Sequence, residues 1–152
     1  LTRIDKDGQI ISGLNPTKEL NLHAAFYETR GSEAGAVVHL HSHYSVALSM
    51  TPGIDVENFL PPLTPYPIMK LGRVKVLPYF QPGDPAMGEA VRNLRGEHPA
   101  IMFANHGPVV AGYDLPSAVY ATEELEAAAR LALEDRHNTF TRLSESQIAK
   151  LK

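Results

Sequence analysis

The sequence has no cysteine and no tryptophan among its 152 residues. Without a thiol, the chain cannot form disulfides, thiolate zinc sites, iron–sulfur clusters or a cysteine nucleophile. The chain also has no strong excess of positive or negative charge, because the formal net charge is only -3 and the Lys and Arg residues are dispersed along the chain. A dispersed, slightly acidic charge argues against a nucleic-acid surface, so we expect no nucleic-acid partner.

Long apolar runs and several well-known motifs are missing as well. No stretch approaches the roughly 20 apolar residues that a membrane helix requires, and residues 1–8 lack a signal-peptide core. The P-loop, the G-x-G-x-x-G fingerprint and the G-x-S-x-G elbow are all absent, which leaves nucleotide binding and serine hydrolysis without support. We expect a soluble, cytoplasmic protein with no membrane partner.

The length and the composition are those of one globular unit. Hydrophobic residues make up 43% and charged residues 20% of the chain, and no linker or repeat divides it. We therefore expect residues 1–152 to form a single domain. Seven histidines and twelve prolines stand out in this otherwise ordinary inventory.

Hydrophobic periodicity and turn residues predict interleaved strands and helices. We expect a hairpin over 1–13, helices over 17–30, 44–50, 85–94 and 114–137, and strands over 36–41, 74–77, 100–104 and 108–111. A polar tail is expected beyond His137. The pattern indicates an α/β or α+β fold in which helices cover a mixed sheet.

Seven of the twelve prolines fall between Pro61 and Pro85. Proline cannot donate a hydrogen bond to a neighbouring strand, so residues 61–67 cannot be a central strand. We expect this segment to be an ordered, extended loop.

His39 and His41 form the most informative local pattern. Residues i and i+2 of a strand point to the same face, so both imidazoles should project together at the end of the strand predicted over 36–41. Two imidazoles supply two of the three protein ligands that a catalytic zinc site usually has. The alternative is that the two histidines are simply hydrogen-bonded side chains in an apolar strand.

Two other histidines are candidates for the third ligand. His43 continues the same spacing, but the chain leaves the strand at Ser42, which aims His43 elsewhere. His106 follows a second buried strand, and the adjacent Gly107 allows a close approach of the backbone. We therefore favour His106, because ligands commonly gather beyond the carboxyl ends of strands.

Glu19 is placed in the first turn of the helix that Asn15-Pro16 opens. It either interacts favourably with the helix dipole or acts as a general acid/base beside the metal. His23, one turn later, is expected to be a packed and hydrogen-bonded residue. The run Glu123-Glu124-Leu125-Glu126 is interpreted as a solvated helix face.

Three motifs occur in a fixed order, namely Pro16-Thr17-Lys18-Glu19, His39-Leu40-His41-Ser42 and Ala104-Asn105-His106-Gly107-Pro108-Val109-Val110-Ala111-Gly112. Together they resemble the class II aldolase/adducin family of sugar-phosphate lyases and epimerases. The resemblance implies α/β/α layers around a mixed, largely antiparallel sheet. It also implies Zn²⁺, or a divalent metal such as Mn²⁺ or Co²⁺, held by His39, His41 and His106, with Glu19 as the acid/base.

Further stretches, at 61–66, 77–79 and 82–86, are similar to the branch of the family that decarboxylates 3-oxo-tetronate 4-phosphates. This implies a small phosphorylated sugar-acid substrate, a metal-stabilised enediolate, and dihydroxyacetone phosphate and CO₂ as products. A fuculose-phosphate-type aldolase, a pentulose-phosphate 4-epimerase and a non-enzymatic adducin-like scaffold remain as alternatives.

Tyr66 matches a tyrosine that aldolases of this family extend into the active site of a neighbouring subunit. The resemblance therefore implies a catalytic Tyr66 and a homotetramer with active sites at its interfaces. Family members also carry an upstream segment with phosphate-binding loops that has no counterpart in these 152 residues. We therefore expect the sequence to be N-terminally truncated and its phosphate-binding residues to lie outside it.

Overall fold

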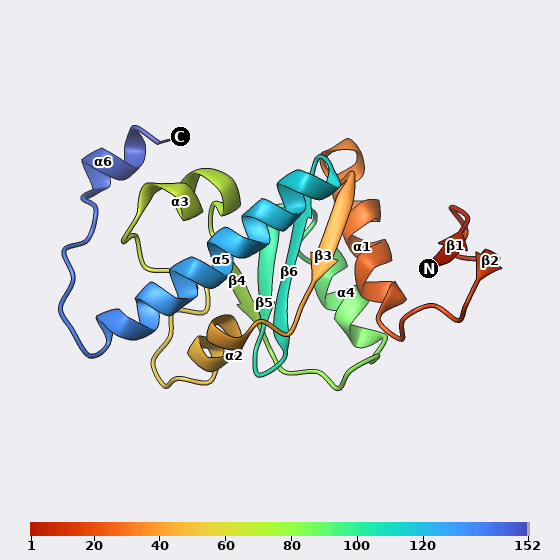
Figure 1. The fold of residues 1–152 in the computed structure, drawn as a ribbon, viewed down its shortest axis with the longest axis horizontal. Helices are drawn as coiled ribbons and strands as arrows, with labels where there is room; N and C mark the ends of the chain where they lie inside the picture. The colour runs from red at the N-terminus through yellow and green to blue at the C-terminus, as the bar shows by residue number, and fades with distance from the viewer. Residues whose placement is uncertain (152) are drawn as a thin grey trace.

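The computed structural model describes residues 1–151 and contains a central sheet with helices on both faces (Figure 1). Its strands are β1 (Thr2–Ile4), β2 (Ile10–Gly13), β3 (Ala36–His39), β4 (Lys75–Leu77), β5 (Ala100–Phe103) and β6 (Gly107–Gly112). Its α-helices are α1 (Leu20–Arg30), α2 (His43–Ser49), α3 (Pro65–Leu71), α4 (Ala86–Arg92), α5 (Leu115–Asp135) and α6 (Glu145–Ala149).

The central sheet has four strands in the order β3-β6-β5-β4. β6 is antiparallel to both β3 and β5, whereas β4 runs parallel to β5. The sheet is therefore mixed, as the sequence predicts. β1 and β2 form the expected hairpin apart from this sheet.

Alternating side chains of the strands divide the core into two layers. Ala100 and Met102 of β5 pack in a cluster with residues of α5 and α3, whereas Ile101 and Phe103 pack in a second cluster with residues of α1 and α4. The two-residue repeat of a strand produces this division, because successive side chains point to opposite faces. Figure 1 shows α5 lying across the sheet, with α1 and α4 beyond β3. The predicted α/β/α layering is confirmed.

α5 begins where the sequence places it. The Asp114 carboxylate accepts a hydrogen bond from the Ser117 backbone N–H (2.8 Å), and the Asp114 N–H donates to Ser117 Oγ (3.0 Å). This reciprocal capping box satisfies two N–H groups that would otherwise lack partners in the first turn. The small, buried alanines of α5 then let the helix pack closely against the sheet.

The expected loop over 61–67 is wrong in its second half, because α3 begins at Pro65. Pro65 occupies the first turn, where the missing N–H costs nothing and the fixed φ angle suits a helix. Tyr66 therefore lies on a helix and not on an extended loop. The tail beyond His137 also contains a helix, α6, which has its own capping box between Ser144 and Gln147.

Two element ends differ from the prediction at residues that matter for the site. α1 begins at Leu20, so Glu19 is the residue that precedes the helix and not a member of its first turn. β3 ends at His39, so His41 lies in the connection to α2. Among residues 1–151, no helix is long and apolar enough to cross a bilayer.

Candidate metal centre

The pairing of β3 with β6 brings the histidine segments together. His39, the last residue of β3, pairs with Val109 of β6, and His106 immediately precedes β6. Because the two strands are antiparallel, the end of one lies beside the start of the other. Two segments that are about 65 residues apart in the sequence therefore meet where these two strands end. His106 is almost fully buried there, at 7% exposure.

Gly107 permits this meeting. A Cβ atom on Gly107 would lie only 2.1 Å from the carbonyl oxygen of Leu40 and 3.3 Å from the Cα of His41. Any other residue at this position would push the β3–α2 connection away from His106. The close approach predicted from the glycine is confirmed.

Glu19 joins the cluster from the turn that precedes α1. Its Oε2 atom lies 3.2 Å from Nε2 of His39, and its Oε1 atom lies 3.1 Å from Nε2 of His106. The carboxylate thus lies between the two imidazoles, and only 12% of the side chain is exposed. One ligand atom from each of Glu19, His39, His41 and His106 can be chosen so that all four lie within 4.8 Å of one another.

The hydrogen bonds of the cluster leave several buried atoms without a partner. Nδ1 of His39 donates to the Pro108 carbonyl oxygen at 2.9 Å, which leaves the lone pair of Nε2 facing Glu19. Within residues 1–151, Glu19 Oε1, His39 Nε2 and both ring nitrogens of His106 have no hydrogen-bond partner. Lone pairs that face a carboxylate repel it unless a proton or a cation lies between them.

The donor set fits a divalent cation. Three imidazoles and a carboxylate are ligands that suit Zn²⁺ and similar metals, and a backbone carbonyl bound to the second ring nitrogen is the usual support for a ligating histidine. Burial lowers the pKa of His106, and the neighbouring His39 and His41 lower it further against the opposing effect of Glu19. A lowered pKa favours the neutral imidazole, which is the form that binds metals.

The other candidates from the sequence lie outside this cluster. His43 is an exposed residue of α2 whose ring packs against Tyr44, with ring centroids 5.2 Å apart. His23 contacts the cluster edge-on, with its ring centroid 6.5 Å from that of His39. Tyr66 is 58% exposed on α3, a helix that packs against α5, and it is not one of the four residues whose ligand atoms converge.

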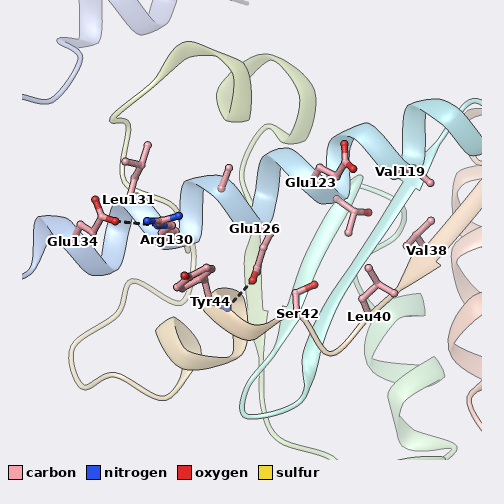
Figure 2. A pocket seen from close by; sticks show the side chains of 12 residues that line it. Val38, Leu40, Ser42, Tyr44, Val119, Glu123, Glu126, Arg130, Leu131 and Glu134 are labelled. Carbon is pink, nitrogen blue, oxygen red and sulfur yellow. Dashed lines mark hydrogen bonds and ion pairs between the residues drawn. The ribbon is translucent and has the colours of Figure 1, made fainter.

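Glu126 has a structural role that the sequence does not predict. Its carboxylate does not face solvent as the Glu-rich run predicts, but accepts hydrogen bonds from the backbone N–H groups of Tyr44 (2.7 Å) and Ser45 (2.9 Å). It also lines a groove of about 950 Å³ between α5 and the β3–α2 connection (Figure 2). No sequence signal separates Glu126 from its neighbours Glu123 and Glu124.

Comparison with known proteins gives a family match. Residues 1–133 match the family model described as the class II aldolase and adducin N-terminal domain. The 3-oxo-tetronate 4-phosphate decarboxylase of Pectobacterium atrosepticum is 43% identical over 131 residues, which cover 86% of this chain and 60% of that protein. The L-fuculose phosphate aldolase of Methanococcus maripaludis (strain DSM 14266) is 35% identical over 127 residues, which cover 84% of this chain and 66% of that protein.

A solved structure shares the same architecture. The crystal structure of YgbL from Escherichia coli superposes with a TM-score of 0.94 at 37% identity, covering 99% of this chain and 72% of that one. The match extends over nearly every described element. The chain thus spans 60 to 72% of the length of these three proteins.

Proposed function

Because the chain belongs to the class II aldolase and adducin family, we propose that it is a metal-dependent lyase that converts 3-oxo-tetronate 4-phosphate to dihydroxyacetone phosphate and CO₂. The observation that carries this proposal is the convergence of three imidazoles and a carboxylate within 4.8 Å, with unpartnered buried atoms facing one another. The name of the 43% identical relative supplies the substrate class. In this proposal, residues 1–152 form a single domain of the class II aldolase and adducin type.

His39, His41 and His106 would hold the divalent cation. Zn²⁺ suits three imidazole ligands, and Mn²⁺ or Co²⁺ are alternatives. When bound, the cation supplies Lewis acidity that stabilises negative charge on substrate oxygens by several kcal/mol. The carbonyl of Pro108 orients the His39 ring so that Nε2 is the atom free to bind.

Glu19 would act as the acid that protonates the reaction intermediate. In the reaction, the bond from C2 to the carboxylate carbon breaks, and its electron pair moves into the C2–C3 bond and onto the C3 oxygen. The resulting enediolate must accept one proton at C2 to become dihydroxyacetone phosphate. The Glu19 carboxyl, held between His39 and His106, would deliver that proton directly or through a water molecule.

Tyr66 belongs to a second part of the proposal. Its exposure on α3, away from the cluster in its own chain, is compatible with a tyrosine that reaches the site of a neighbouring subunit. We place such sites at the interfaces of a homotetramer, in which Tyr66 would orient the substrate or assist proton transfer. A phosphorylated substrate is met in the cytoplasm, where we place the enzyme.

The test is product analysis with the full-length protein and stoichiometric Zn²⁺. Incubation with 3-oxo-tetronate 4-phosphate should release CO₂ and dihydroxyacetone phosphate in equal amounts. In D₂O, the product should carry one deuterium at the carbon that lost the carboxylate, since the proton arrives from solvent through Glu19. Absence of both products under these conditions would overturn the decarboxylase proposal.

An aldolase is the second candidate, and the 35% identical L-fuculose phosphate aldolase favours it. Aldol cleavage of a ketose 1-phosphate generates the same kind of enediolate, so the cluster alone does not separate the two reactions. The same preparation should therefore be offered L-fuculose 1-phosphate, with release of an aldehyde as the readout. Rapid cleavage without decarboxylation would establish the aldolase in its place.

A further inference from the structure

The short helix α2 connects the two segments that carry histidines of the cluster. α2 begins at His43, two residues after His41. At its other end, Ser49 Oγ accepts a hydrogen bond from the backbone N–H of Asn105 at 3.0 Å, and Asn105 directly precedes His106. Any movement of α2 would therefore displace both His41 and His106.

The residue before His106 has a backbone conformation that requires such support. Asn105 has a φ angle of 60°, in the left-handed region that non-glycine residues rarely adopt. Asn tolerates this region better than most residues, but the conformation persists only where surrounding contacts fix it. The hydrogen bond to the buried Ser49, which is 7% exposed, is one such contact.

α2 is itself held by a carboxylate from α5, the helix that it packs against on the same face of the sheet. Glu126 of α5 accepts from the N–H groups of Tyr44 and Ser45 and, at 2.5 Å, from the Ser45 hydroxyl. Ser45 is fully buried, so water does not replace the two bonds that Ser45 makes. Figure 2 shows the Glu126 side chain extending from α5 to the start of α2.

α2 depends on this external anchor for two reasons. A helix of seven residues is too short to be stable by itself, and the Ser42 side chain at its start makes no capping hydrogen bond. The Glu126 carboxylate fills that role, because a negative charge at a helix N-terminus satisfies free N–H groups and interacts favourably with the helix dipole. Hydrogen bonds to a charged acceptor are also stronger than neutral ones.

We propose that Glu126 is a positioning residue of the metal centre, acting through α2 on His41 and His106. This rests on the proposed function, in which those histidines bind the metal. Glu126 contacts neither the histidines nor Glu19 by any hydrogen bond or ion pair among the described residues. It sets the spacing of the ligands and takes no part in the chemistry.

The test compares Zn²⁺ affinity and the visible spectrum of the Co²⁺-substituted full chain. Glu126→Ala should bind Zn²⁺ about 10- to 100-fold more weakly, as is typical when a support of metal ligands is removed, and should alter the Co²⁺ absorption bands. Glu126→Gln retains one acceptor oxygen and should lie between Glu126→Ala and wild type. Glu123→Ala, an exposed carboxylate one turn earlier on α5, should behave as wild type.

A stability control separates positioning from simple loss of folding. Val74→Ala removes buried apolar volume at residue 74, which precedes β4, and it should lower the melting temperature without changing the Co²⁺ spectrum. Wild-type affinity and spectrum in Glu126→Ala would overturn this proposal alone, and so would equal spectral changes in Val74→Ala. A wild-type chain that binds no Zn²⁺ would overturn the proposed function together with it.

Discussion

At the scale of single residues, Glu19 carries the sharpest prediction. Glu19→Gln keeps the shape of the side chain and all three imidazoles, but it removes the group that would carry the proton. We expect the variant to retain stoichiometric metal and to lose about 100- to 10,000-fold in kcat. Metal analysis and steady-state kinetics measure the two properties separately.

The matched control for Glu19→Gln is Glu97→Gln, which makes the same change at an exposed position. That variant should show wild-type kcat and metal content. Near-normal turnover in Glu19→Gln would contradict the proton-transfer role. Loss of metal from Glu19→Gln would instead make the carboxylate a ligand.

Gly107 gives a second prediction at this scale. In Gly107→Ala, the new Cβ atom would collide with the Leu40 carbonyl oxygen at 2.1 Å, so the β3–α2 connection must move. We expect a loss of about 1–3 kcal/mol in unfolding free energy, typical of overpacking, together with weaker Zn²⁺ binding. Chemical denaturation and chelator competition measure these effects.

Gly53→Ala is the comparison for Gly107→Ala, because Gly53 has a φ angle of 75° and open space around its Cβ position. Its cost should be only the backbone strain of about 1–2 kcal/mol, with unchanged Zn²⁺ affinity. If Gly107→Ala bound Zn²⁺ as tightly as Gly53→Ala, the close approach would have no bearing on the cluster.

The sequence reveals the cluster residues but not all of their supports. The spacing of His39 and His41 and the position of His106 after a buried strand are local signals, and the order of the motifs adds Glu19. Glu126 lacks such a signal because its partners, Tyr44 and Ser45, are more than 80 positions away in the chain. Only the packing of α2 against α5 brings that carboxylate to its amides.

At the scale of elements, the capping box of α5 predicts a defined pH dependence. Hydrogen bonds from the Ser117 side chain and backbone lower the pKa of Asp114 below its ordinary value of 3.8. A lowered pKa in the folded state means that the ionised cap stabilises the protein above pH 3.8, and that this contribution is lost as the pH falls through the folded value. Asp114→Ala should thus have a lower melting temperature at pH 7.

The difference in melting temperature between wild type and Asp114→Ala should therefore shrink steadily below pH 3.8. Glu124→Ala, within the same helix but with no capping role, should show no such pH-dependent difference. A gap for Asp114→Ala that stayed constant down to pH 2 would show that its ionisation does not contribute to capping. Thermal melts followed by circular dichroism provide the measurement.

The sequence predicts a helix or strand correctly where an apolar pattern or a capping residue marks it. It fails at α3 and α6, where no apolar pattern marks the helix. The four strands of the central sheet are short β-branched or apolar runs, and α5 has both a cap and an apolar stripe. α3 was missed because the prolines of residues 61–67 argue against a strand without revealing that Pro65 starts a helix. α6 was missed because its residues are mostly polar, although Ser144 and Gln147 form a capping box that a search for S-x-x-Q finds.

At the scale of the whole molecule, the metal would join two distant parts of the chain. The end of β3 and the connection to α2 contribute His39 and His41, the turn before β6 contributes His106, and the turn before α1 places Glu19 beside them. An unfolded chain does not hold these groups together, so a metal that binds only the folded form stabilises it by mass action. Free Zn²⁺ at 100 times its dissociation constant should add about 2.7 kcal/mol, which raises the melting temperature by roughly 5–11 °C for a domain of this size.

The stabilisation by Zn²⁺ should depend on the three histidines of the cluster and not on histidines elsewhere in the chain. His106→Ala removes a buried ligand and should abolish most of the Zn²⁺-induced shift, whereas His137→Ala removes an exposed imidazole outside the cluster and should leave the shift intact. Calorimetric scans with Zn²⁺ and with excess chelator measure both variants. Equal shifts in the two would mean that Zn²⁺ acts at surface groups, and it would remove the metal centre from which the proposed reaction follows.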